Sequence, residues 1–113
     1  MTIRELVIQY QDEVKNGNLL PERASEIMTE VASLLGNIND EITKRDMEYN
    51  QVLLYCLEAE KSANKAKIKA GITAEYKSMR DARNTEKSAT ELIRSLKFYL
   101  KVKESEYQNT KFQ

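Results

Sequence analysis

The residues most able to bind another molecule form a basic cluster between positions 61 and 87. Eight lysine and arginine side chains fall in this stretch against three acidic ones, Glu75, Asp81 and Glu86, which leaves a net charge of 8 − 3 = +5. Basic side chains gathered on one surface bind the phosphate backbone of nucleic acids, because binding releases condensed counterions. The eight candidate residues are Lys61, Lys65, Lys67, Lys69, Lys77, Arg80, Arg83 and Lys87.

The basic cluster has two other interpretations. Its side chains could form an ordinary solvated surface that pairs with the acidic half of a second copy, or they could bind an acidic protein partner. Charge is unevenly distributed along the chain, so the basic half could meet nucleic acid, the acidic half of a second copy or an acidic protein. Residues 1–60 carry five Lys/Arg and twelve Asp/Glu, a net of −7, whereas residues 61–113 carry thirteen and six, a net of +7.

Catalytic chemistry has few candidates in this chain. There is no histidine, which removes the commonest general base, the usual Ser or Cys triads and most zinc sites. The one cysteine, Cys56, cannot form an intramolecular disulfide, and its place among apolar residues indicates a buried small hydrophobe. Gly17, Gly36 and Gly71 are isolated, so no glycine-rich loop can hold a phosphate.

We therefore predict no catalytic, cofactor or metal site and no small-molecule substrate. An enzyme would have to use carboxylates and tyrosines alone. The glutamates fit a solvated helix face, and the tyrosines fall mostly at apolar helix positions, which favours core or interface packing over base stacking. These residues are Glu41, Glu48, Glu58 and Glu60, and Tyr10, Tyr49, Tyr55, Tyr76, Tyr99 and Tyr107.

Helices must position these side chains, because three glycines and one proline are too few for the turns of a sandwich or barrel. Thr2 and Glu5 have the spacing of a capping box, in which each side chain satisfies a free backbone N–H of the other. This predicts a first helix over residues 3–16. Asn16-Gly17-Asn18 ends it, since Gly and Asn tolerate the left-handed conformation.

A long second helix is predicted to begin at Pro21, because proline costs little at a first helical position. Apolar residues continue to Ala70 in steps of three and four, with one extra four-residue step between Ile38 and Ile42. Because this spacing is kept across Gly36, we predict one helix over residues 21–70, about 75 Å long, with Gly36 as a site for a kink. The alternative is two helices that meet at Gly36-Asn37.

The segment Ala70–Thr73 is the predicted reversal. Gly71 can cap the outgoing helix and Thr73 can N-cap a final helix over residues 74–108. Apolar positions near this reversal are mostly alanine, which buries little area, so this end should be thin. The other end carries Leu, Ile and Tyr and can hold the first helix.

Residues 1–113 are thus expected to form a single all-α domain. Its fold would be a long antiparallel helical hairpin, coiled-coil-like, with a short N-terminal helix packed at one end. Such an arm leaves part of its apolar surface uncovered, so we expect self-association. No apolar run approaches the roughly 18 residues of a membrane span, and the N-terminus lacks the apolar stretch of a signal peptide. We expect a cytoplasmic protein with no membrane partner.

The second half of the chain combines an Ala/Glu/Lys-rich helix, a short Gly-Thr break and a second helix with a Leu- and Lys-rich end. The residues that carry this pattern are Glu60, Ala63, Ala66, Ala70, Gly71, Thr73, Glu75, Leu92, Leu96, Lys97, Leu100, Glu104 and Glu106. From about Glu58 to Gln108 the chain resembles small helical proteins of tailed bacteriophages. The resemblance implies a phage accessory protein that works near DNA replication or recombination in the bacterial host cell, and it assigns no functional residue.

These observations favour a non-enzymatic helical interaction protein, oligomeric and phage-derived, that contacts nucleic acid through a basic hairpin tip. An alternative is a phage inhibitor or adaptor of a host protein, which would use its acidic half to dock on a basic surface. The acidic residues for that role are Asp40, Glu41, Asp46 and Glu48. A structural assembly component is a further alternative.

Overall fold

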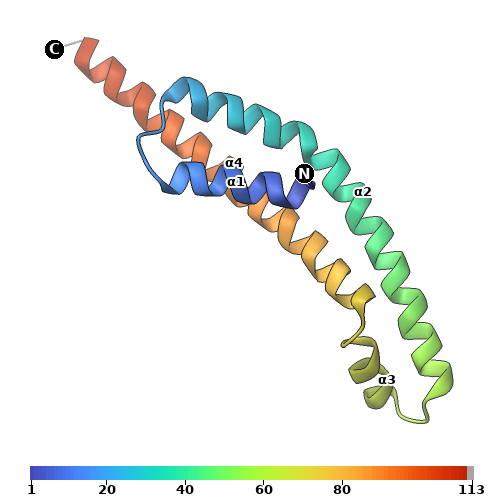
Figure 1. The fold of residues 1–113 in the computed structure, drawn as a ribbon. Coiled ribbons are helices and arrows are strands. Elements are labelled where there is room, and N and C mark those ends of the chain that lie inside the picture. The colour runs from blue at the N-terminus through green and yellow to red at the C-terminus, as the bar shows by residue number, and fades with distance from the viewer. Residues whose placement is uncertain (112–113) are drawn as a thin grey trace. The chain divides into compact units, whose positions relative to one another are not determined.

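The computed structural model describes residues 1–111 and forms an all-α fold (Figure 1). Its helices are α1 (Ile3–Lys15), α2 (Pro21–Ala59), α3 (Ala63–Ala70) and α4 (Ala74–Lys111), and no strand occurs in this range. The two long helices α2 and α4 form the predicted helical hairpin, and α1 is the predicted short N-terminal helix.

The chain divides into two compact units. The first unit contains Met1–Leu35 and the chain from Lys87 onward, and the second unit contains Gly36–Glu86. Helices α2 and α4 each contribute to both units, whereas α1 belongs to the first and α3 to the second.

Helix α1 begins at the capping box that the sequence predicts. The backbone N–H of Glu5 donates to Thr2 Oγ1 at 3.1 Å, and the backbone N–H of Thr2 donates to Glu5 Oε2 at 3.4 Å. The helix ends at Lys15, where Gly17 (φ +80°) and Asn18 (φ +59°) take left-handed conformations. These two residues turn the chain toward α2, as expected of Gly and Asn after a helix.

The first unit is held by large apolar side chains from three helices. Tyr99 of α4 also donates a hydrogen bond from its hydroxyl to the backbone carbonyl of Leu19, in the connection between α1 and α2. Fully burying a Val, Leu or Ile side chain contributes about 1.5–3 kcal/mol, so this unit holds most of the burial energy. Its buried residues are Val7, Tyr10, Ala24, Ile27, Val31, Ala89, Leu92 and Leu96.

The second unit is thin, as the alanine-rich sequence predicts. Its buried residues are Ile38, Ala66, Ala70, Ala82 and Thr85, so Ile38 is its only large buried apolar side chain among the described residues. A buried methyl group contributes only about 0.8 kcal/mol, so alanines permit close helix approach with little burial energy.

Helix α2 passes through Gly36 without interruption, as the unbroken apolar spacing predicts. The prediction that it continues to Ala70 is wrong. The helix ends at Ala59, and a non-helical segment, Glu60–Ser62, separates it from α3. Ser62 is the N-cap of α3, since its side chain accepts from the backbone N–H of Lys65 at 3.5 Å.

This break also corrects the position of the reversal. Figure 1 shows the chain turning back between α2 and α3, so the reversal falls at Glu60–Ser62 and not at Gly71. Gly71 caps α3 in a right-handed conformation (φ −72°), and Thr73 caps α4 as predicted. The Thr73 hydroxyl accepts from the Tyr76 N–H at 3.2 Å and donates to the Ala70 carbonyl at 2.7 Å.

Candidate functional site

All eight residues of the predicted basic cluster are exposed. Lys61 lies between α2 and α3, three more lie on α3, and four lie on α4. Seven belong to the second unit, and Lys87 belongs to the first unit. We call the seven the basic tip: Lys61, Lys65, Lys67, Lys69, Lys77, Arg80 and Arg83.

Helix geometry aligns part of the basic tip. Lys77, Arg80 and Arg83 follow one another at intervals of three residues along α4, so each is a neighbour of the next in a row that winds around the helix by about 60° per step. The lysines of α3 are less regular, because Lys65 and Lys69 share a side whereas Lys67 lies on another. The basic tip therefore presents charge in several directions around both α3 and α4.

Two residues of the basic tip are paired with carboxylates of the same unit. Lys69 forms an ion pair with Glu60, and this hydrogen bond raises the pKa of the Lys69 ammonium above its usual value. Arg83 donates two hydrogen bonds to Asp46 of α2, at 3.3 Å from Nε and 2.5 Å from Nη2. In each pair the basic side chain is largely exposed, whereas the side chains of Glu60 and Asp46 keep only 20% and 28% of their surface accessible. Ion pairs with one solvent-exposed partner contribute little to stability.

The other five residues of the basic tip, Lys61, Lys65, Lys67, Lys77 and Arg80, are unpaired. They form no ion pair with any residue in the described range 1–111. Their positive charges are therefore free to meet an anionic partner.

The acidic residues of α2 differ from the basic tip, because most are already paired. Arg45 lies between two glutamates of its own helix, with Nε 2.7 Å from Glu41 and Nη1 2.9 Å from Glu48. The hydrogen bond to Glu41 contributes most to raising the pKa of Arg45. Asp46 is held by Arg83, so only Asp40 of the four candidate acidic residues lacks such a pair within the part of the chain that the structure describes.

Residues 1–111 contain no group of three or more His, Cys, Asp or Glu side chains arranged to hold a metal ion. Cys56 is a free thiol and is half-buried, not fully buried as its place in the sequence predicts. A shallow hollow in the second unit is lined by Glu48, Gln51, Val52, Tyr55 and Glu75.

The tyrosines divide between packing and exposure. Tyr49 and Tyr76 pack with ring centroids 5.5 Å apart and planes tilted by 58°, which links α2 to α4 in the second unit. Tyr10 is buried in the first unit, and this burial is the largest cause of a pKa raised to about 12. Tyr55 and Tyr107 are exposed, with 72% and 69% of their surface accessible.

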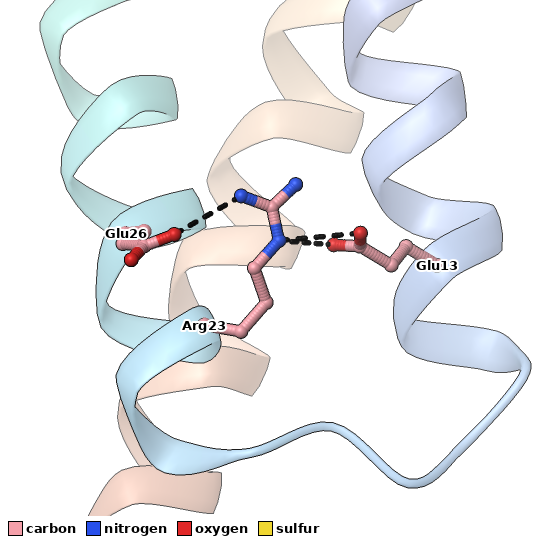
Figure 2. Close-up of polar contacts among 3 residues, drawn as sticks. All are labelled: Glu13, Arg23 and Glu26. Atoms are coloured by element: carbon pink, nitrogen blue, oxygen red, sulfur yellow. Dashed lines mark hydrogen bonds and ion pairs between the residues drawn. The ribbon is translucent and has the colours of Figure 1, made fainter.

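A polar cluster around Arg23 was not predicted from the sequence. Figure 2 shows Arg23 of α2 between Glu13 of α1 and Glu26 of its own helix. Its Nε lies 2.9 Å and 3.2 Å from the two carboxylate oxygens of Glu13, and its guanidinium lies 5.7 Å from the centre of the Tyr10 ring. These contacts join two helices of the first unit. They depend on how α1 meets α2, which no spacing along the sequence reveals.

No helix within residues 1–111 combines the length and the apolar character that a membrane span requires. Comparison with known protein families, with curated proteins and with solved structures found no significant match to this chain.

Proposed function

We propose that this chain is a non-enzymatic helical protein that binds nucleic acid through the basic tip. The observation that carries the proposal is the set of five exposed, unpaired cations on and beside α3 and on the first turns of α4. Exposed lysine and arginine side chains bind phosphate charge without reading base sequence.

The strength of such binding follows from counterion release. Each phosphate neutralised on duplex DNA contributes about −0.9 to the slope of log K against log salt concentration. Five contacts give a slope of about −4 to −5 on this rule, with a dissociation constant on the order of micromolar at low salt.

The resemblance of residues 58–108 to small helical proteins of tailed bacteriophages supports a role near phage DNA replication or recombination. The alternative role, an adaptor that docks through its acidic half, has less support. Glu41, Asp46 and Glu48 are held in ion pairs within the chain and are less available to a basic partner.

Fluorescence anisotropy with labelled duplex and single-stranded DNA at several salt concentrations tests the proposal. The triple variant K65Q/K67Q/K77Q should weaken binding at least tenfold at low salt and reduce the salt slope by about 3. The matched control R94Q/K97Q/K101Q removes three exposed cations of α4 in the first unit and should change the affinity less than threefold.

Absence of DNA binding by the wild-type chain at low salt would overturn the proposal. Equal weakening by the two triple variants would also contradict it, because binding would then depend on net charge and not on the basic tip. Circular dichroism of each variant confirms that helix content is retained.

A further inference from the structure

The second half of α2 is more apolar than a two-helix hairpin can cover. Six consecutive residues, Val52–Leu57, are apolar, and at about 100° per residue they extend all the way around the helix. Val52, Leu53 and Cys56 are half-buried within the second unit, whereas Leu54 and Leu57 remain exposed. A helix that is apolar on every side is normally enclosed on every side.

The exposed residues follow a regular spacing. Met47, Asn50, Leu54 and Leu57 are separated by steps of three, four and three, which is the spacing of core positions in a coiled coil. Met47, Leu54 and Leu57 have 60%, 58% and 41% of their surface accessible, and Asn50 is also exposed. We call these four residues the outer stripe.

Opposite charges flank the outer stripe at its two ends. Lys44 lies one turn before Met47 and Glu58 directly follows Leu57, and both side chains are exposed. Neither forms an ion pair within the described chain. In coiled-coil spacing both occupy the same flanking position, so they lie along the same edge of the outer stripe.

We propose that a second copy of this chain packs antiparallel along the outer stripe. Met47 then lies opposite the partner's Leu57, and Asn50 lies opposite the partner's Leu54. The two-fold axis passes near Gln51, and Lys44 meets the partner's Glu58 at each end. The contact is isologous and closes on itself, which makes a dimer and not a filament.

The charges along the edge of Lys44 and Glu58 favour this direction of packing. On the other edge Asp46 comes near the partner's Glu60, but each of these carboxylates already pairs with a cation of its own chain, Arg83 or Lys69. In an antiparallel pair, equivalent flanking positions of the two helices meet, so the two ends each join a lysine to a glutamate. In a parallel pair Lys44 would meet the partner's Asn39, and Glu58 would meet the partner's Leu53, so no opposite charges would be joined.

The interface is short. From Met47 to Leu57 the helix rises about 15 Å, so the contact falls toward the lower end of specific interfaces, and we expect a dissociation constant on the order of micromolar. Dimerisation through α2 does not require nucleic acid. It can therefore be tested separately from the proposed binding of nucleic acid by the basic tip.

Sedimentation equilibrium of the full chain without nucleic acid, from about 1 to 500 μM, tests the dimer. The wild type should change from monomer to dimer across this range. K44E and E58K should each weaken dimerisation about tenfold, because each places two pairs of like charges at the ends of the interface. K65E is the matched control, since it makes the same charge change at an exposed lysine of α3, and it should change the dissociation constant less than twofold.

Two charge exchanges make the test specific for the antiparallel register. An equimolar mixture of K44E and E58K should dimerise as well as the wild type, because the mixed dimer restores an opposite-charge pair at both ends. The double variant K44E/E58K should also regain wild-type affinity.

Three outcomes would overturn the proposal: a wild type that stays monomeric at 500 μM, single variants that behave like K65E, or a mixture that does not recover. A monomeric wild type would also be the result if another protein covers the outer stripe. Replacement of Leu54 by lysine should abolish the dimer while circular dichroism shows retained helix.

Discussion

The two units of this chain use the same helices for different purposes. In the first unit, α2 and α4 bury Ile27, Val31, Leu92 and Leu96 together with residues of α1. In the second unit the buried residues are mostly alanines, and large apolar side chains such as Leu54 remain exposed. The difference indicates that the first unit supplies stability, while the second leaves its charges and apolar surface available for binding.

The largest expected effect on the free energy of unfolding comes from a comparison of two isoleucines. Ile27 is fully buried in the first unit, so Ile27→Ala should lower the free energy of unfolding by about 2–5 kcal/mol. Ile72 of the second unit is 82% exposed, so Ile72→Ala should change it by less than about 0.5 kcal/mol. Urea unfolding followed by circular dichroism measures both values, and equal losses would contradict the placement of Ile27 in the core and Ile72 on the surface.

Alkaline pH should weaken the first unit through Tyr10. Burial raises the pKa of its hydroxyl from 10.0 to about 12, so the folded chain holds this proton more tightly than the unfolded chain. The associated stability is complete below pH 10 and is lost as the pH rises toward 12, by up to about 3 kcal/mol. Because lysines and other tyrosines titrate in the same range, the measurement is the difference between wild type and Tyr10→Phe, which should show a smaller decline.

A cap substitution tests the break that separates α2 from α3. Ser62→Ala removes the acceptor for the Lys65 N–H and should cost about 1 kcal/mol. The effect should appear as faster amide hydrogen exchange in α3, with exchange in α1 unchanged. Unchanged protection throughout α3 would show that the cap does not hold this helix.

The smallest predicted effect is the coupling free energy of a single ion pair, measured for one pair in each unit. Double-mutant cycles for Arg23 with Glu13, and for Arg83 with Asp46, should each give only a small coupling, because all four side chains are partly exposed. The first coupling should be the larger, since Arg23 also contacts Glu26 and the Tyr10 ring. A larger coupling for Arg83 would show that the second unit depends on charge more than on burial.

Local sequence signals predicted the ends of several helices well. The pair Thr2 and Glu5, the left-handed residues after α1 and the Thr73 cap act through hydrogen bonds within a few residues, so the sequence contains all the information needed. The continuity of α2 through Gly36 was also predictable, because the apolar spacing is kept on both sides.

The break at Glu60–Ser62 was not predictable by the same means. Ala59, Ala63, Ala66 and Ala70 keep a helical spacing across it, and alanine favours helix at each of these positions. Ser62 lacks the acidic partner three residues later that would complete a capping box, so its signal is weaker than that of Thr2.

The candidate site was predictable in its residues but not in its pairing. Exposure of all eight basic residues follows from their charge and from their place outside the apolar positions. Which of them meet carboxylates depends on contacts between residues far apart in sequence. The Arg83–Asp46 pair spans 37 residues, and only the register of α2 against α4 determines it.

The passage of α2 through Gly36 affects how the chain unfolds. Glycine costs about 1 kcal/mol relative to alanine within a helix, so melting of the second unit can stop at this residue and leave the large buried side chains of the first unit in place. No atom lies within 4 Å of a Cβ added at Gly36, so an alanine would fit there without strain. We therefore expect partial unfolding of α2 to stop at Gly36, so that the half of this helix in the second unit can melt while the half in the first unit stays helical.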